Sequence, residues 1–329
     1  MHRTLTARHD RFALSRPFRI AREVKTEADT VTVSIRAGAL EGRGEGVPSS
    51  RYGESVEDAL AAIEGIRPAV EAGAGREELL GLLPAGAARN AVDCALWDLE
   101  ARETGRSVAA LLGAPEPEPI ASARTIVIDT PMMMGCAARR AAHAPLLKVK
   151  VDGRLPDAQI RAVRAAAPDA RLIVDPNESW DARLVEAMQP VLAALKVDLL
   201  EQPVPAGIDA CLETFRPLVP IAADESLHTR EDLDRVARRY QVVNVKLDKA
   251  GGLTEGLHLA RAARARGLGL MSGCMVGSSL SIAAALHIAR MSDFVDLDGP
   301  IWLAKDRPGG VEDRGGTLYP PLPGFWGTP

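Results

Sequence analysis

The 329-residue sequence has no apolar run that approaches the roughly 20 residues of a membrane-spanning helix. Its first residues, Met1–Arg16, are polar and basic and lack the apolar stretch of a secretory signal. The basic residues are dispersed and the formal net charge is −4, so there is no electrostatic reason to expect a nucleic-acid partner. We therefore expect neither a membrane nor a nucleic acid among its partners.

Cysteine is scarce, and its spacing excludes two further classes of protein. The four cysteines, Cys94, Cys136, Cys211 and Cys274, lie far apart in the sequence and show no CxxC spacing. A disulfide-stapled scaffold and a cysteine metal motif are therefore not expected. The thiols are interpreted as free, which is typical of a reducing compartment and predicts a cytoplasmic location.

The first part of the chain mixes strand and helix patterns. Residues Thr30–Arg36 alternate between apolar and polar side chains and predict an antiparallel strand. The glycines near Gly42–Gly46, followed by Pro48–Gly53, predict turns and a mobile loop. The pattern is helical from 55 to 112, with a strongly amphipathic helix over Asn90–Arg102. Three prolines then follow at 115, 117 and 119, so we place a domain boundary there and assign 1–118 to an α+β domain.

After the prolines, short apolar segments alternate with helical patterns. Strands are expected at 121–128, 146–151, 172–175, 198–201, 221–224, 242–246, 268–271 and 294–296, and helices at 131–143, 156–167, 182–195, 210–218, 230–240, 254–266 and 279–291. A closed parallel βα barrel over 119–305 is the simplest arrangement of this series. The alternative, a doubly wound open sheet, would need a glycine-rich fingerprint that is missing. The tail, 306–329, is expected to pack back on the N-terminal strands and complete the first domain.

Acidic residues end three consecutive predicted strands: Asp175, Glu201 and Asp224. Strand C-termini meet at one end of a βα barrel, so these carboxylates would converge and repel one another without a cation. Oxygen ligands without His or Cys favour a hard ion, and we predict Mg²⁺. The alternative for each acid is an N-cap of the following helix. Three such acids in consecutive strands favour the metal site.

Lysines occupy two of the predicted strand ends. Lys148 and Lys150 share one face of the strand Leu146–Val151, either as a solvated surface or inside a pocket. Lys246 ends the sixth strand, which lies opposite the second in an eight-stranded barrel. One lysine could remove an α-proton and the other return it, which is the geometry of a racemase or epimerase. This chemistry requires a metal-stabilised enediolate and a lowered lysine pKa, and Lys148 and the cation would both lower that of Lys150.

A second acidic pair occurs at the eighth strand. Asp296 and Asp298 alternate there and are expected to face the same way. They could be solvated acids in a turn or a cap near Gly299. Beside a metal site, the pair is interpreted as a clamp for a substrate ammonium group.

With these motifs the sequence resembles the enolase superfamily, muconate-lactonising subgroup, whose sites combine lysine or histidine bases with Mg²⁺. The similarity covers nearly the whole chain and extends to the L-Ala-D/L-Glu epimerases of the dipeptide epimerase family. Its most discriminating feature is Asp296-Leu-Asp298, because the family's Asp-x-Asp motif binds the free amino terminus of the dipeptide. Cycloisomerases and N-acylamino-acid racemases of the subgroup lack that motif.

The resemblance implies an enolase-like, modified (β/α)7β TIM barrel with an α+β N-terminal capping domain. It implies an isomerase that epimerises the C-terminal residue of a dipeptide by two-lysine proton transfer, in the metabolism of peptidoglycan peptides. The roles it implies are acid/base catalysis by Lys150 and Lys246, Mg²⁺ on Asp175, Glu201 and Asp224, the amino-terminal clamp Asp296 and Asp298, contacts to the substrate carboxylate from Lys148 and Thr125, pairing of Arg22 with a glutamate side chain, and a lining position for Cys274.

Two other functions stay open from the sequence. The nearer is N-acylamino-acid racemisation or cycloisomerisation on the same scaffold. The more distant is a non-catalytic, metal-stabilised binding protein, although binding alone gives no reason to keep two buried lysines beside a cation. The first residue of the dipeptide, the breadth of specificity and assembly into a homo-oligomer are not determined by the sequence.

Overall fold

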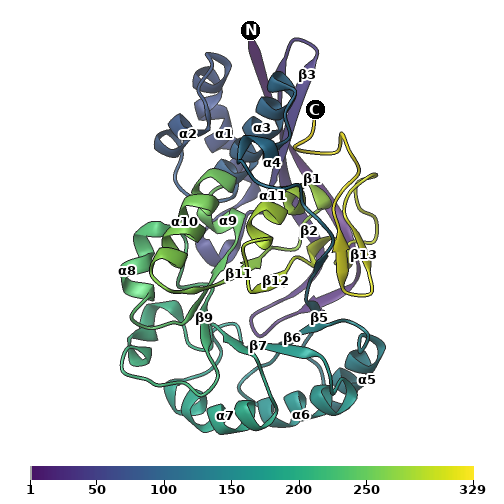
Figure 1. The fold of residues 1–329 in the computed structure, drawn as a ribbon, viewed down its shortest axis with the longest axis vertical. Helices are drawn as coiled ribbons and strands as arrows, with labels where there is room; N and C mark the ends of the chain where they lie inside the picture. Colours follow the sequence, from purple (N-terminus) through teal and green to yellow (C-terminus); the bar gives the residue numbers. More distant parts are fainter. Residues whose placement is uncertain (1) are drawn as a thin grey trace.

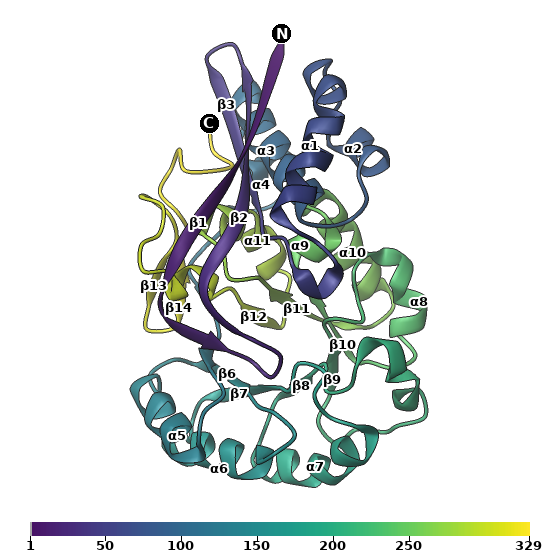
Figure 2. The ribbon, with the colours of Figure 1, turned by 180° about the vertical axis from the view of Figure 1, so that it is seen from behind.

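The computed structural model describes residues 2–329, which form a strand-and-helix layer at one end and a barrel at the other (Figure 1). The layer contains an antiparallel sheet of three strands, β1 (Arg3–Arg19), β2 (Val24–Ala37) and β3 (Leu40–Gly46), followed by η1 (Ser50–Tyr52), α1 (Val56–Glu71), α2 (Arg76–Leu82), α3 (Ala87–Thr104) and α4 (Val108–Leu111). The long β1–β2 hairpin extends from this layer toward the barrel strands (Figure 2). Its turn therefore reaches the barrel from outside.

The barrel is one parallel sheet of eight strands in chain order: β5 (Arg124–Ile126), β6 (Leu146–Lys150), β7 (Arg171–Asp175), β8 (Leu199–Glu201), β9 (Ile221–Ala223), β10 (Val242–Val245), β11 (Gly269–Gly273) and β12 (Phe294–Asp296). Its two edges meet where Ala123 N donates a hydrogen bond of 2.8 Å to Val295 O. The predicted enolase-like barrel with a cap is confirmed.

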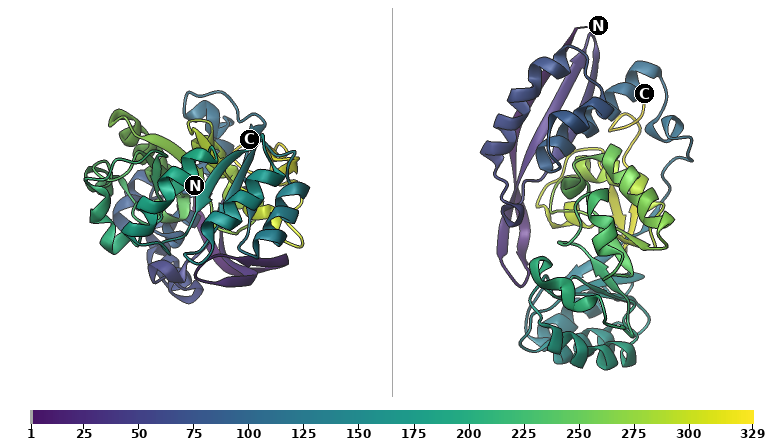
Figure 3. Two further views of the ribbon diagram at one scale, coloured as in Figure 1. Left: turned by 90° about the horizontal axis from the view of Figure 1, so that it is seen from below. Right: turned by 90° about the vertical axis from the view of Figure 1, so that its left-hand side faces the viewer.

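Helices surround the barrel strands (Figure 3). They are α5 (Pro131–Arg140), α6 (Pro156–Ala166), α7 (Ala182–Ala194), η2 (Ala206–Leu212), η3 (Arg230–Asp232), α8 (Leu233–Val236), α9 (Leu247–Ala250), α10 (Leu253–Ala265), α11 (Ser279–Ala289) and η4 (Gly299–Trp302). None of the helices within residues 2–329 is long and apolar enough to cross a membrane.

Two of the expected helices were predicted wrongly. The segment 210–218 is not an α-helix, because η2 ends at Leu212 and irregular chain follows. Pro217 lies in this segment and Pro220 just beyond it, and proline removes a backbone donor and disfavours helix in the residue before it. The segment 230–240 forms only η3 and the four-residue α8. The connections after β8 and β9 therefore contain only short helical segments.

The tail of the chain contacts both parts of the molecule. Strands β13 (Glu312–Arg314) and β14 (Thr317–Tyr319) form a small sheet with β4 (Ile120–Ala121). Farther on, Trp326 donates its indole N–H to Arg43 O of β3 at 2.9 Å. The division of the chain at residue 118 stays a prediction.

The expected helix over Asn90–Arg102 lies within α3, but α3 is buried on almost every side rather than amphipathic. It lies between β3 and the barrel elements α9 and α10. Its charged side chains are paired rather than solvated: Asp93 accepts hydrogen bonds from Thr254, and Arg89 donates to the Gly251 and Ala250 carbonyls. The helix therefore joins the cap to the barrel.

The glycines Gly42, Gly44 and Gly46 lie in β3 and not in the turn or mobile loop that was expected. A Cβ at Gly44 would overlap the carbonyl oxygen of Ala91 in α3, and its neighbours meet α3 in the same way. Two strand residues advance about 6.6 Å and four helix residues about 6.0 Å, so alternate glycines match successive helix turns. The expectation failed because these glycines are required by close packing on α3, which is far away in the sequence.

We predict that Gly44→Ala destabilises the protein by about 1–3 kcal/mol, because the backbone of α3 cannot move without disturbing the cap–barrel contact. Urea unfolding measures this change. The control is Gly65→Ala in α1, where nothing lies within 4 Å of the added Cβ. That variant should be stabilised by about 0.5–1 kcal/mol. Equal effects of the two substitutions would contradict the close packing of β3 on α3.

Candidate active site

The candidate site lies one layer above an apolar floor inside the barrel. The floor is a buried cluster with one residue from each strand or its start: Ala123, Leu146, Ile173, Leu199, Ala222, Val242, Met271 and Phe294. Side chains alternate along a strand, so the residue two positions later in each strand faces the same interior. Those residues are Thr125, Lys148, Asp175, Glu201, Asp224, Asn244, Gly273 and Asp296. Strand periodicity alone therefore places a largely polar and charged layer directly above the hydrophobic floor, at the barrel mouth.

Lys148 is buried at the centre of this charged layer. Its Nζ lies 2.8 Å from Asp296 Oδ2 and 3.1 Å from Asp175 Oδ2. It also lies 2.7 Å from Glu201 Oε2, in an ion pair without hydrogen-bond geometry. Burial disfavours the ammonium group, but these carboxylates outweigh it and hold the pKa of Lys148 well above its usual range. The lysine face of β6 was expected to lie either on a solvated surface or inside a pocket. The first interpretation is wrong, because Lys148 and Lys150 are both buried.

Lys150 and Lys246 pair with different carboxylates. Lys150 Nζ lies 2.5 Å from Asp175 Oδ2 and 3.0 Å from Asn177 Oδ1. Lys246 Nζ lies 2.7 Å from Asp224 Oδ2. The strands that carry the two lysines, β6 and β10, are separated by β7, β8 and β9 in the ring of eight. The two ammonium groups therefore enter the pocket from opposite walls.

A fourth lysine, which the sequence analysis did not select, supports Asp224 from behind. Lys249 in α9 donates to Asp224 Oδ1 at 2.6 Å, to the Asp224 carbonyl, and to Asn244 O at 3.2 Å. Its side chain is buried, and burial lowers its pKa. Its position three residues after Lys246 was the only available signal. Four lysines thus face four carboxylates in this layer.

The pKa values of the carboxylates diverge with their partners. Burial raises the pKa of Glu201 to about 7, and the charge of Asp175 adds to the shift. Burial would also raise the pKa of Asp175, but Lys150 and Lys148 outweigh it and lower the value to about 2. Lys246 and Lys249 likewise hold the pKa of Asp224 well below its usual range. Asp175 and Asp224, which accept hydrogen bonds from lysines, therefore stay ionised, whereas Glu201 contacts Lys148 without hydrogen-bond geometry.

Lys246 has a raised pKa, whereas the predicted chemistry requires a lowered lysine pKa beside a bound cation. Burial lowers its pKa, but the charge of Asp224 outweighs burial and raises the pKa above the usual range. The cause is direct pairing of the ammonium group with the carboxylate, which the sequence could not reveal. A lowered pKa would require that Asp224 be engaged by another positive charge.

The donor set fits a hard divalent cation in chemistry. Asp175, Glu201 and Asp224 end or follow three adjacent strands and offer only oxygen. Glu201 Oε2 is buried without a hydrogen bond. Within residues 2–329, no three acidic, histidine or cysteine side chains are close enough together to hold a metal ion. The carboxylates are instead paired with the ammonium groups of Lys148, Lys150 and Lys246, which supply the positive charge between them.

The acidic pair at the eighth strand also lines the pocket. Asp296 ends β12, whereas Asp298 lies beyond the strand at the start of η4. Asp298 Oδ2 accepts from Thr125 N at 2.9 Å and from the Trp302 indole at 3.3 Å, while Asp296 Oδ1 is buried without a partner. Burial, reinforced by Asp296, raises the pKa of Asp298 to about 6.

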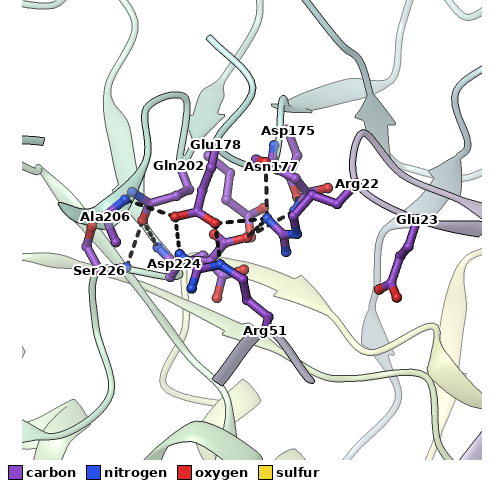
Figure 4. A network of polar contacts seen from close by, with 12 residues as sticks. Arg22, Glu23, Arg51, Asp175, Asn177, Glu178, Gln202, Ala206, Asp224 and Ser226 are labelled. Carbon is purple, nitrogen blue, oxygen red and sulfur yellow. Dashed lines mark hydrogen bonds and ion pairs between the residues drawn. The ribbon is translucent and has the colours of Figure 1, made fainter. Parts of the chain in front are cut away.

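The remaining predicted residues, Thr125, Cys274 and Arg22, also line this pocket. Burial raises the pKa of the Cys274 thiol well above its usual range. Arg22 lies in the turn between β1 and β2 and contacts the barrel acid Glu178 (Figure 4). It also contacts Glu225. The pocket is thus lined by all the predicted site residues except Asp175 and Glu201, which are buried against Lys150 and Lys148.

Several pocket residues were missed by the sequence analysis. Arg51 and Tyr52 reach the pocket from η1, and Asn177 and Glu225 line it from the barrel. Tyr52 stacks edge-on against His228, with ring centroids 4.6 Å apart. The signal for Asn177 and Glu225 was their position beside Asp175 and Asp224. No local pattern marked Arg51 or Tyr52.

Comparison with known proteins shows similarity over the whole chain. Residues 133–325 match the family described as enolase C-terminal domain-like, and residues 2–113 match the mandelate racemase / muconate lactonizing enzyme N-terminal domain. The chain is 48% identical over 319 residues to L-Ala-D/L-Glu epimerase of Escherichia coli (strain K12), covering 96% of this chain and 99% of that protein. It is 42% identical to N-acetyl-D-glutamate racemase of Pseudoalteromonas sp, covering 90% and 95%.

Two solved structures are similar in fold. One is an enolase family member from Agrobacterium tumefaciens with homology to dipeptide epimerases, with bound sodium, L-Ala-L-Glu and an ordered loop. It has a TM-score of 0.96 and 46% identity, and the match covers 99% of this chain and 100% of that one. The other is a dipeptide epimerase from Methylococcus capsulatus complexed with Mg and L-Arg-D-Lys. It has a TM-score of 0.89 and 33% identity, with coverage of 97% of both chains.

We predict that Lys148→Met lowers the thermal unfolding temperature in metal-free buffer, because three buried carboxylates lose a positive charge, a change that typically costs about 3–5 kcal/mol. Added Mg²⁺ should raise the unfolding temperature more in this variant than in the wild type, because the cation replaces the lost charge. The exposed Lys305→Met is the control and should behave as wild type. An equal Mg²⁺ response in all three proteins would contradict the charge argument.

Proposed function

The chain belongs to the mandelate racemase and muconate lactonizing enzyme family of the enolase superfamily, and on that basis we propose that it is a Mg²⁺-dependent dipeptide epimerase acting on L-Ala-D/L-Glu. The observation that carries the proposal is the pair Lys150 and Lys246, which enter one pocket from opposite walls above three carboxylates. The relative of known activity and the structure with bound L-Ala-L-Glu support the choice of substrate.

Asp175, Glu201 and Asp224 would hold the Mg²⁺ ion. When bound, the ion supplies positive charge that stabilises the negative charge developing on the substrate carboxylate as the α-proton leaves. If Asp175 and Asp224 held the ion, the ammonium groups of Lys150 and Lys246 would be released from these partners. Lys246 would then lose the carboxylate that raises its pKa, and its buried Nζ would become a better base.

Lys150 and Lys246 act as the two acid/base groups. One lysine takes the α-proton of the C-terminal residue into its Nζ, and the other delivers a proton to the opposite face. Both lysines are buried, which excludes water from the proton-transfer path. Inversion at the α-carbon follows from the opposite placement of the two groups.

The other pocket residues bind and orient the dipeptide. Asp296 and Asp298 receive its free ammonium group, for which the unpartnered Asp296 Oδ1 is available. Lys148 and Thr125 contact the substrate carboxylate or its surroundings, Arg22 pairs with the glutamate side chain, and Cys274 lines the cavity. The domain 1–118, completed by the tail 306–329, caps the barrel domain 119–305 and covers the substrate.

The substrate suggests a role in the metabolism of peptidoglycan peptides. All four cysteines are free, with Cys136 and Cys211 exposed. Free exposed thiols are typical of a reducing compartment, and we propose a cytoplasmic location on that ground.

N-acylamino-acid racemisation is the second candidate, because a relative 42% identical to this chain is an N-acetyl-D-glutamate racemase. The two candidates share the lysines and the metal. They differ in the amino group, which is free and charged in a dipeptide but acylated and neutral in the alternative substrate. The acidic pair at the eighth strand therefore distinguishes them.

Proton NMR of L-Ala-L-Glu in D₂O with the enzyme and Mg²⁺ should show loss of the glutamate α-proton signal together with appearance of the L-Ala-D-Glu diastereomer. Lys150→Ala and Lys246→Ala should each abolish epimerisation. One variant should still exchange the α-proton of the L,L dipeptide and the other that of the L,D dipeptide, because each lysine serves one face. Retained epimerisation in either variant would refute the two-lysine mechanism.

Asp298→Asn should raise the KM for L-Ala-L-Glu by about tenfold or more, because a charge-assisted contact to the ammonium group is worth about 1.5–3 kcal/mol. Turnover of N-acetyl-glutamate measures the alternative. If N-acetyl-glutamate is the better wild-type substrate and Asp298→Asn leaves both KM values unchanged, the acyl-amino-acid racemase is the correct assignment.

A further inference from the structure

The guanidinium group of Arg22 is bound to the barrel through one nitrogen only. Its Nη1 donates to Glu225 Oε1 at 2.8 Å, to Glu178 Oε2 at 3.0 Å and to Asn177 O at 3.1 Å. Within residues 2–329 its Nε and Nη2 make no hydrogen bond to protein. These two nitrogens form the side-on fork that binds a carboxylate through two parallel N–H bonds. Arg22 lines the pocket, so the fork is the part of the side chain left for a ligand.

Glu178 is held in place by a second arginine from a different loop of the cap. Arg51 in η1 uses its own side-on fork on Glu178, with Nε 2.7 Å from Oε2 and Nη2 2.6 Å from Oε1. The backbone N–H of Ala206 completes the set at 2.9 Å from Oε1. The carboxylate therefore joins two cap segments, the β1–β2 turn and η1, at one point of the barrel (Figure 4).

The backbone that carries Glu178 is also fixed. Asn177 and Glu178 have left-handed conformations, with φ of 45° and 68°, which are uncommon for residues other than glycine. Glu178 N donates to Gln202 O at 2.9 Å, and its side chain is only 7% exposed. A strained and nearly buried carboxylate with four donors is a precise structural arrangement, and the proton-transfer chemistry described above does not use it.

We propose that Glu178 is a positioning residue for substrate selection: it anchors Nη1 of Arg22 so that the free Nε–Nη2 fork receives the side-chain carboxylate of an acidic dipeptide residue. The inference rests on the proposed dipeptide epimerase function. Glu178 itself touches no reacting atom, and its effect passes through Arg22. The Arg51 fork keeps Glu178 oriented and compensates its charge.

The test is a comparison of L-Ala-L-Glu with its neutral isostere L-Ala-L-Gln as substrates of Glu178→Gln. Glutamine removes the charge that attracts Arg22. In either orientation its NH₂ also faces two donors, Arg22 Nη1 and Arg51 Nε at one oxygen position or Arg51 Nη2 and Ala206 N at the other. Loss of this anchor should raise the KM for L-Ala-L-Glu about tenfold, with little change in kcat or in the KM for L-Ala-L-Gln. In an Arg22→Met background, Glu178→Gln should leave the selectivity between the two dipeptides unchanged.

Two further variants complete the design. Glu186→Gln in α7 removes the same charge at an exposed position and should behave as wild type. Arg51→Lys keeps the positive charge but loses the fork, so it should shift selectivity in the same direction as Glu178→Gln even if the latter does not fold.

Three outcomes would overturn the inference. An equal loss for both dipeptides would mean that Glu178 is only structural. A lower KM for L-Ala-L-Glu in Glu178→Gln would mean that Glu178 competes with the substrate for Arg22. A wild-type enzyme that epimerises neither dipeptide would refute the proposed function and the inference with it, whereas the first two outcomes leave the proposed function intact.

Discussion

Charge compensation in a desolvated layer is the constraint on which the rest of this structure depends. Lys148, Lys150, Lys246 and Lys249 face Asp175, Glu201, Asp224 and Asp296 at the barrel mouth. An unpaired charge at such depth would cost several kcal/mol, so each group holds its neighbours in place. The balance also makes the site responsive, because a divalent cation or an ionised substrate can enter only by redistributing these pairs.

The apolar framework fixes the positions of these charged side chains. The floor residues fill the barrel beneath the charged layer, and the period-two alternation of each strand aligns the two layers. On the other side, the glycines of β3 allow close packing on α3, and α3 in turn contacts the barrel elements α9 and α10. The β1–β2 turn and η1 extend from this rigid contact, which places Arg22 and Arg51 over the strand ends.

Local periodicity explains which parts of the site were predictable. Lys148, Asp175, Glu201 and Asp224 lie at fixed offsets from apolar strand residues, so their convergence follows once a parallel barrel is inferred. The protonation balance was not predictable in the same way. The pairing of Lys246 with Asp224, which raises the pKa of Lys246, depends on side-chain placement across two strands.

The sequence by itself determined the barrel, the capping domain and the residue types at the strand ends, because these depend on short-range patterns of apolar and charged side chains. Only the tertiary structure decided the role of the glycines in β3 and the junction at Glu178. Glu178 meets Arg51 and Arg22 across 127 and 156 residues of chain, and no local pattern encodes such a contact. It forms because two loops of the cap and one of the barrel are brought to the same point by packing far from the site.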